Sequence, residues 1–168
     1  GAQGMMSSYN EVDGVPTSSD KWLLTDQLRG EFGFEGYVAS DFGAISGLGE
    51  GNHAVAANDS ECVRTFLEAG GSVNGHDFGD NYEKLVVELV SEGRMSTHTL
   101  DTAAGSVLAV KERLGLLSDP FVNESLVETS LGQAQSHRDV ARQMALESVV
   151  LLRNQDNTLP LDPNKISR

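Results

Sequence analysis

The sequence has one cysteine, few basic residues and no long apolar run. Its 12 Lys and Arg residues stand against 25 Asp and Glu residues, and the formal net charge is -13. A phosphate-binding surface needs clustered Lys and Arg, so this balance argues against nucleic acid and anionic membranes as partners. The single Cys62 excludes an internal disulfide. No apolar run approaches the roughly 20 residues needed to cross a bilayer, so no membrane span is expected.

The remaining composition is ordinary for a globular chain. Of the 168 residues, 39% are hydrophobic and 22% are charged. An acidic chain without a basic patch suits a neutral ligand, such as a sugar, better than an anionic one. The sequence begins at Gly1 without an initiator methionine or a signal-peptide pattern and enters a strand pattern almost at once. We therefore expect a fragment of a longer protein.

Apolar periodicity and turn residues predict an α/β fold. Residues 4–9 and 37–41 are predicted strands, and a helix over 20–29 joins them. Ser19 is the expected cap of this helix and Gly30 its terminator, so the segment forms one βαβ unit.

The other expected elements continue this alternation. Helices are predicted over 59–69, 82–92, 97–114 and 137–147, strands over 72–74 and 148–153, and a polar linker between 118 and 133. The apolar residues expected to face the core are Cys62, Val63, Phe66 and Leu67 in the first helix, Tyr82, Leu85, Val86, Leu89 and Val90 in the second, and Leu100, Ala104, Val107, Leu108 and Leu114 in the third. Gly115 is placed for a left-handed cap after the third helix.

Asp41 is the candidate catalytic residue. It ends the β-prone run that begins at Tyr37, and four glycines follow within ten positions. Such a loop can turn sharply and leave the carboxylate facing a cleft, which is where barrel enzymes place their chemistry. Asp is also common as a helix cap or turn residue, so the pattern alone leaves both interpretations open.

Residues on either side of Asp41 resemble the signature of glycoside hydrolase family 3, the β-glucosidase and β-xylosidase family. The matching residues are Met6, Tyr9, Asn10, Gly14, Pro16, Leu24, Leu28, Arg29, Gly33, Phe34, Gly36, Ser40 and Asp41. The resemblance continues at 111–116 and 145–161 and covers nearly the whole chain. The sequence departs from the family at Phe42, where tryptophan is more frequent, and at 69–75, where many relatives have an aspartate.

The resemblance implies a fold and a domain organisation. Residues 1–117 would be the C-terminal part of a (β/α)8-type catalytic barrel, with about five upstream strand–helix units absent. Residues 118–133 would be the inter-domain linker. Residues 134–168 would begin a truncated α/β sandwich domain with its first helix and strand.

The resemblance also implies retaining hydrolysis of terminal β-D-glucosyl residues, with Asp41 as the nucleophile. β-Xylosidase and β-N-acetylglucosaminidase activities of the same family are alternatives. The acid/base would lie beyond residue 168 and further sugar-binding residues before residue 1, so this chain alone is expected to be inactive. The expected partner is a β-linked glucoside or oligosaccharide, without a metal or organic cofactor. Relatives suggest a secreted or periplasmic location, and the oligomeric state stays open.

Three further residues are candidates for substrate binding. Tyr9 resembles the family tyrosine whose hydroxyl lies near the nucleophile, although a barrel-core aromatic is an equally good interpretation. Met6 corresponds to an apolar residue beside the sugar, or it fills a gap as an ordinary strand methionine. Phe42 could stack on a pyranose ring or be buried at a barrel rim.

Other functional classes have weaker support. The glycine-rich run at 47–51 resembles a phosphate cradle but lacks the following Lys and Ser or Thr. His53, His76, Asp77 and Asp80 lack metal-ligand spacing, so a solvated loop is the default there. Glu50, Asp77 and Asp80 are the carboxylates nearest to Asp41 by loop position, yet no spacing places any of them across a sugar. A non-catalytic carbohydrate-binding or interaction piece is the alternative outside enzymes.

Overall fold

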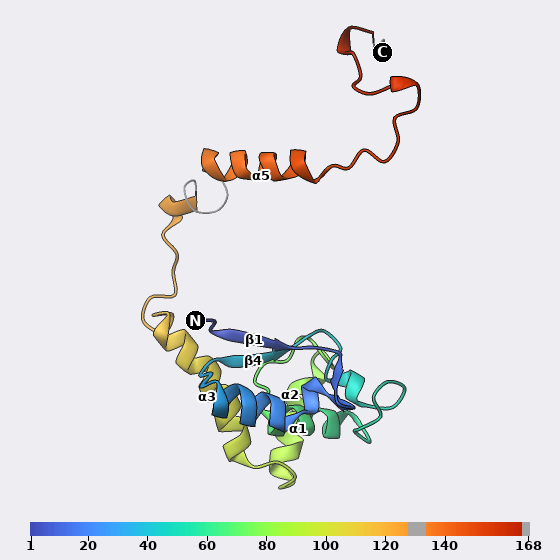
Figure 1. Cartoon of the computed structure of the whole chain (residues 1–168). Coiled ribbons are helices and arrows are strands. Elements are labelled where there is room, and N and C mark those ends of the chain that lie inside the picture. Colours follow the sequence, from blue (N-terminus) through green and yellow to red (C-terminus); the bar gives the residue numbers. More distant parts are fainter. Residues whose placement is uncertain (128–133, 166–168) are drawn as a thin grey trace. The chain divides into compact units, whose positions relative to one another are not determined.

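The parallel strands β1 (Gly4–Ser7) and β4 (Tyr37–Ser40) lie side by side, with helices packed against them (Figure 1). The structure is a computed structural model that describes residues 1–127 and 134–165. It divides into two units, residues 1–120 and 121–168. The first unit contains the predicted α/β alternation, and it contains all the candidate site residues.

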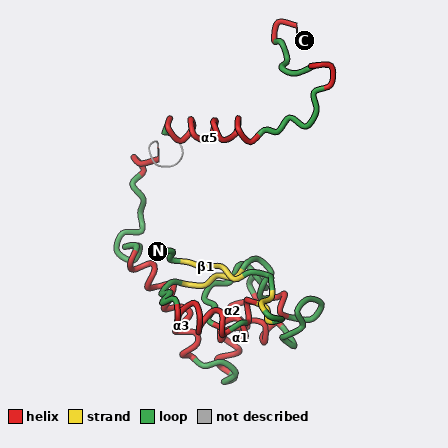
Figure 2. The backbone as a smooth tube through the Cα atoms, in the orientation of Figure 1, coloured by secondary structure: helices red, strands yellow, loops and turns green. Residues whose placement is uncertain are grey.

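β1 and β4 form a two-stranded parallel sheet, drawn in yellow in Figure 2, and residues 72–74 form a third segment that joins β4 only through an isolated bridge. Gly4 pairs with Tyr37 and Ser7 with Ser40, and Val73 forms a parallel bridge to Ala39. The predicted strands at 4–9 and 37–41 are therefore present in shortened form, whereas the predicted strand at 72–74 is reduced to the single bridge at Val73. The small antiparallel pair β2 (Glu11–Val12) and β3 (Val15–Pro16) lies between β1 and the first helix. These strands support an α/β fold, and the complete barrel stays a prediction.

The first helix differs from its predicted bounds. The π-type helix η2 spans Trp22–Glu31, and Gly30 lies within it instead of ending it. Asp20, not Ser19, caps the start, because its Oδ1 accepts the N–H of Leu23 at 3.1 Å. Ser19 instead donates to the carbonyl of Pro16 in the 3-10 turn η1 (Thr17–Ser19). The sequence offered two adjacent capping residues, and the short turn before the helix moved the cap by one residue.

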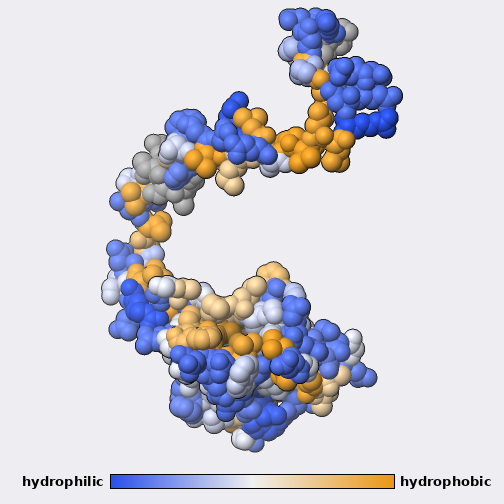
Figure 3. Space-filling view, viewed as in Figure 1, coloured by the Kyte–Doolittle hydropathy of each residue, from blue (hydrophilic) through white to orange (hydrophobic). Residues whose placement is uncertain are grey.

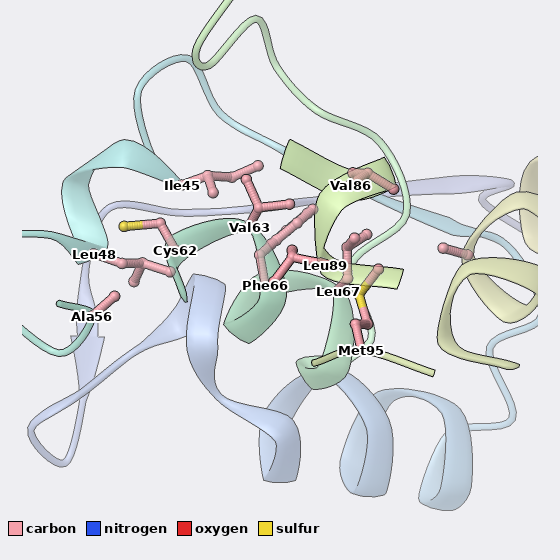
Figure 4. Packing of buried hydrophobic residues seen from close by; sticks show 11 residues of the cluster. Ile45, Leu48, Ala56, Cys62, Val63, Phe66, Leu67, Val86, Leu89 and Met95 are labelled. Carbon is pink, nitrogen blue, oxygen red and sulfur yellow. The ribbon is translucent and has the colours of Figure 1, made fainter. Parts of the chain in front are cut away.

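Helices α1 (Asp59–Ala69) and α2 (Asn81–Ser91) form the main hydrophobic core. The predicted bounds of α1 are confirmed: Asn58 accepts the N–H of Glu61, and Gly70 ends the helix in the left-handed conformation at φ 115°. The predicted core faces of both helices are confirmed as well. Figure 4 shows the packing of this cluster, whose buried members are Ile45, Leu48, Ala56, Cys62, Val63, Phe66, Leu67, Val86, Leu89, Met95 and Ala103.

Helix α3 (Thr97–Arg113) buries a different face from the predicted one. Its buried residues are Ala103 and Val110, whereas Leu100 and Leu108 are exposed. Ser106 donates to the hydroxyl of Ser72 at 2.9 Å, so small residues let α3 lie close to the third strand segment. The positions of the large apolar residues therefore did not predict which face of α3 is buried.

The predicted glycine cap of α3 is confirmed. Gly115 has φ 73°, and its N–H donates to the carbonyl of Glu112 at 2.9 Å. The N–H of Leu116 donates to the carbonyl of Lys111 at 2.9 Å. These two bonds form a Schellman motif, which satisfies carbonyls at the helix end.

The second unit contains α5 (Gln135–Ser148), close to the predicted helix at 137–147. The predicted strand at 148–153 is wrong: α5 includes Ser148, and 149–153 has no regular structure. A strand requires a hydrogen-bonded neighbour, and no described residue pairs with this apolar segment, part of the apolar surface in Figure 3. Part of the predicted linker, 128–133, lies outside the described residues. The short turns are η4 (Glu124–Leu126), η5 (Gln155–Asn157) and η6 (Pro163–Lys165).

Candidate active site

The carboxyl ends of β1 and β4 lie at one edge of the small sheet. β1 ends at Ser7 and β4 ends at Ser40, and the third segment, bridged to β4 at Val73, runs parallel to them. The chain leaves each segment in the same direction, so Tyr9, Asp41 and Gly75 follow at this edge. Open α/β sheets bind ligands beyond the carboxyl ends of their strands, which makes this edge the candidate active site.

Asp41 is partly exposed at the first position after β4. Its Oδ1 accepts the backbone N–H of Phe42 at 2.7 Å, and its carbonyl accepts the N–H of Ala44 at 3.1 Å. The second bond closes a tight turn, and Gly43 within it has φ 75°. The turn directs the chain away from the sheet and holds the carboxylate at the strand end.

The side chain of Tyr9 reaches this turn from the end of β1. Its hydroxyl donates to the carbonyl of Phe42 at 2.7 Å, and the residue is 50% exposed. The pKa of Tyr9 is raised, first by desolvation and then by hydrogen bonding to Asp41 and by its negative charge. The structure thus brings Tyr9, Asp41 and Phe42 together at the end of the sheet.

Met6 and Phe42 are both exposed. Met6 pairs with Ala39 on the neighbouring strand β4. Side chains alternate between the two faces of a sheet, so Met6, Ala39 and the position two residues after Ala39, Asp41, belong to the same face. Met6 is 63% exposed and Phe42 is 75% exposed. Burial of Phe42 in the core is therefore not its role in this unit, and its ring is available for contact with a ligand.

The loop after the third strand segment supports the turn at Asp41. The N–H of Gly75 donates to Oγ of Ser40 at 2.8 Å. A Cβ at Gly75 would lie 2.4 Å from the carbonyl oxygen of Ser40 and 3.0 Å from the carbonyl carbon of Asp41. Only glycine lets this loop approach the end of β4 so closely.

Asp77 fixes the segment that follows Asp41. Its Oδ1 accepts the N–H of Ser46 at 2.8 Å. Asn74 and Asp77 also exchange two hydrogen bonds, of 2.7 and 2.9 Å. Asp77 is only 3% exposed, so the expectation of a solvated loop is wrong at this residue. The Asn74-Gly75 pair after a strand indicated a tight turn, but nothing in the sequence indicated that Asp77 would fold inward.

One carboxylate oxygen of Asp77 lacks a partner. Among the described residues, Oδ2 is the buried side-chain oxygen for which no hydrogen bond is found. A buried acceptor without a donor costs free energy, so the Ser46 bond does not fully compensate the burial of Asp77. The negative charge of Asp77 also contributes to the raised pKa values of Tyr9 and Tyr82.

The alternative sites receive no support. The N–H groups of Gly47, Leu48 and Gly49 donate to the carbonyls of Gly43, Ile45 and Ser46, so they cannot cradle a phosphate. Within residues 1–127 and 134–165, no group of three or more His, Cys, Asp or Glu side chains could hold a metal ion. No helix in the same ranges is long and apolar enough to span a membrane.

Comparison with known proteins identifies matches along the whole chain. The family model described as the glycosyl hydrolase family 3 N terminal domain matches residues 1–110. A periplasmic beta-glucosidase from Salmonella typhimurium is 39% identical over 165 residues, covering 96% of this chain and 21% of that protein. A beta-xylosidase from Formosa agariphila is 29% identical over 173 residues, covering 99% of this chain and 23% of that protein.

The structural similarity agrees with the sequence similarity. A beta-glucosidase from Listeria innocua solved with glucose has a TM-score of 0.74 and 36% identity, covering 96% of this chain and 22% of that chain. The same enzyme was also solved as a mutant with laminaribiose. The chain spans about a fifth of the length of these relatives.

Proposed function

Because this chain belongs to glycosyl hydrolase family 3, we propose that it supplies the nucleophile of a retaining β-glycosidase. Asp41 is the nucleophile. The observation that supports this role most directly is the position of its carboxylate at the carboxyl end of β4, beside the hydroxyl of Tyr9.

The reaction proceeds in two steps. The Asp41 carboxylate attacks the anomeric carbon and forms a glycosyl ester, while a second carboxyl group protonates the departing oxygen. Water then attacks the ester, and the second group accepts its proton. Tyr9 donates its hydroxyl proton to the carbonyl of Phe42 and so holds the turn that carries Asp41.

The second carboxyl group lies in a part of the protein outside this chain. A retaining enzyme needs its two carboxyl groups about 5 Å apart. Among the loop carboxylates that follow Asp41, Asp77 is buried and its Oδ1 accepts the N–H of Ser46. Since the chain spans about a fifth of its relatives, the isolated chain is inactive and the longer protein is the enzyme.

The substrate is a terminal β-D-glucoside or a β-linked glucose oligosaccharide. This choice follows the beta-glucosidase relatives and the glucose and laminaribiose bound to one of them. The exposed ring of Phe42 offers an apolar surface for one face of the sugar. The beta-xylosidase relative supports β-xylosides as the second candidate substrate.

Hydrolysis of an aryl β-D-glucoside by the full-length protein tests this function. Asp41→Asn should lower kcat by on the order of 10⁴-fold, as removal of a nucleophile does in other covalent mechanisms. Asp80→Asn is the matched control, because Asp80 is exposed and makes no side-chain cap bond to α2. Equal activity of the two variants would contradict the role of Asp41. An aryl β-xyloside assayed in parallel decides between the two substrates.

A further inference from the structure

His53 connects the segment after Asp41 to the segment that contains Tyr9. Its Nδ1 lies 2.8 Å from Oε1 of Glu11, and its Nε2 lies 3.0 Å from the backbone carbonyl oxygen of Tyr9. The side chain of His53 is 14% exposed and that of Glu11 is 46% exposed. The imidazole therefore lies mostly covered between two segments separated by more than 40 residues.

The backbone of His53 is fixed to the 3-10 turn η3 (Ser46–Leu48). Its N–H donates to the carbonyl of Gly47 at 3.1 Å. Two residues later, the N–H groups of Val55 and Ala56 both donate to the carbonyl of Leu48, whose side chain is fully buried. The ring consequently extends from a rigid base, and its contacts restrain the segment at Tyr9 and Glu11.

Both partners of the ring are hydrogen-bond acceptors. A backbone carbonyl oxygen can only accept a hydrogen bond, so Nε2 of His53 must carry a proton to bind Tyr9. The carboxylate of Glu11 lies on the other side of the ring, 2.8 Å from Nδ1, and helps to fix the orientation of the imidazole.

We propose that His53, held in place by its contact with Glu11, positions Tyr9 for the reaction at Asp41. The segment that follows the nucleophile restrains Tyr9 at two points. Nε2 of His53 binds the backbone carbonyl of Tyr9, and the hydroxyl of Tyr9 donates to the carbonyl of Phe42. His53 is a positioning residue that does not touch the reacting atoms. This inference rests on the proposed function of Asp41.

Two substitutions at His53 separate the two hydrogen bonds. Gln places an amide N–H near the position of Nε2 and can still bind the carbonyl of Tyr9, whereas Asn places it near Nδ1 and can bind only Glu11. In the full-length enzyme, His53→Asn should lower kcat about 10-fold with little change in KM, equivalent to one lost hydrogen bond. His53→Gln should recover most of this loss. His98→Asn, at an exposed position of α3, is the control.

A double substitution tests whether His53 acts through Tyr9. In a Tyr9→Phe background the hydroxyl is absent, so His53→Asn should cause little further loss of kcat. If the two losses multiply, or if Asn and Gln reduce kcat equally, His53 does not position Tyr9. Plain destabilisation of the loop would lower activity in both backgrounds.

A measurement without substrate keeps this inference separate from the proposed function. In the 15N-histidine-labelled protein, NMR should show a proton on Nε2 of His53, the nitrogen that faces the carbonyl of Tyr9, with the signal assigned through the His53→Gln variant. A ring whose Nε2 carries no proton cannot donate to this carbonyl and overturns the inference. A protonated Nε2 in a protein without glycosidase activity overturns the proposed function alone.

Discussion

The N–H of Gly75 donates a hydrogen bond to Oγ of Ser40 across 2.8 Å, which joins the loop after the third strand segment to the end of β4. Ser40 precedes the candidate nucleophile Asp41 directly. The position of the carboxylate therefore depends on a loop that is more than 30 residues away in sequence. Close contact at this point requires a residue without a side chain.

Gly75→Ala should displace this contact. The new Cβ would lie 2.4 Å from the carbonyl oxygen of Ser40, and backbone atoms cannot give way as a flexible side chain can. We expect a loss of about 1–3 kcal/mol in the free energy of unfolding, together with a lower kcat/KM.

Gly105→Ala is the matched control for Gly75→Ala. Gly105 lies inside α3, and a Cβ added there would have no heavy atom of a neighbouring residue within 4 Å. This variant should be more stable by up to about 1 kcal/mol, because alanine favours the helix. Denaturant unfolding and steady-state kinetics of the two variants provide the comparison. Two variants with the same stability and activity would show that the close approach is unimportant.

Substitutions at Asp77 should distinguish the contributions of its two carboxylate oxygens to stability. Asp77→Ala removes the acceptor for the N–H of Ser46 and should destabilise the protein by about 1–3 kcal/mol. Asp77→Asn keeps an acceptor oxygen and replaces the unpartnered Oδ2 with an amide group. We expect Asn to be clearly more stable than Ala in thermal unfolding. The reverse order would mean that the bond from Ser46 to this side chain does not stabilise the loop.

Tyr9→Phe should lower kcat/KM about 10-fold, because it removes one hydrogen bond near the nucleophile. Tyr37→Phe is a suitable control, since Tyr37 lies at the start of β4 and its ring packs over Gly4. Kinetics on an aryl β-glucoside measure both variants. A Tyr9→Phe enzyme with the activity of the Tyr37→Phe enzyme would assign Tyr9 a purely structural role.

Stability should fall at alkaline pH. Burial, followed by the charge of Asp77, raises the pKa of Tyr82 from 10.0 to about 12. Burial, followed by the charge of Asp59, raises the pKa of Cys62 from 9.0 to about 11. Between the ordinary and the raised pKa of each group, the unfolded chain has lost a proton that the folded chain retains. The free energy of unfolding therefore declines as the pH rises from about 9 to 12.

Tyr82→Phe should remove the tyrosine contribution to this decline. Two pKa units correspond to about 3 kcal/mol at most, reached near pH 12. Denaturant unfolding followed by circular dichroism at several pH values measures the slope in each protein. An unchanged slope in Tyr82→Phe would contradict the assignment of this pH dependence to Tyr82.

Local signals in the sequence predicted those parts of the fold that local interactions determine. Helix α1 has its Asn58 cap, its apolar face and its terminal Gly70 within one short segment, so its bounds could be predicted. The core face of α3 could not, because close approach to Ser72 selected the small residue Ala103 over the larger Leu100 and Leu108.

The candidate site shows the same division. The strand and glycine pattern and the family resemblance made Asp41 a candidate, and the resemblance alone made its neighbour Tyr9 one. The supporting roles of Gly75, Asp77 and His53 depend on contacts between segments 30 or more residues apart. No periodicity or short motif records such contacts, so only the structure revealed them.

Trapping the covalent intermediate tests the central claim most directly. The full-length protein is treated with a 2-fluoro-β-glucoside that bears a good leaving group, and the labelled peptide is mapped by mass spectrometry. A glycosyl ester on Asp41 is the predicted result, and it establishes both the nucleophile and the retaining mechanism. Label on another carboxylate, or steady hydrolysis of aryl β-glucosides without any label from glucose or xylose traps, would contradict it.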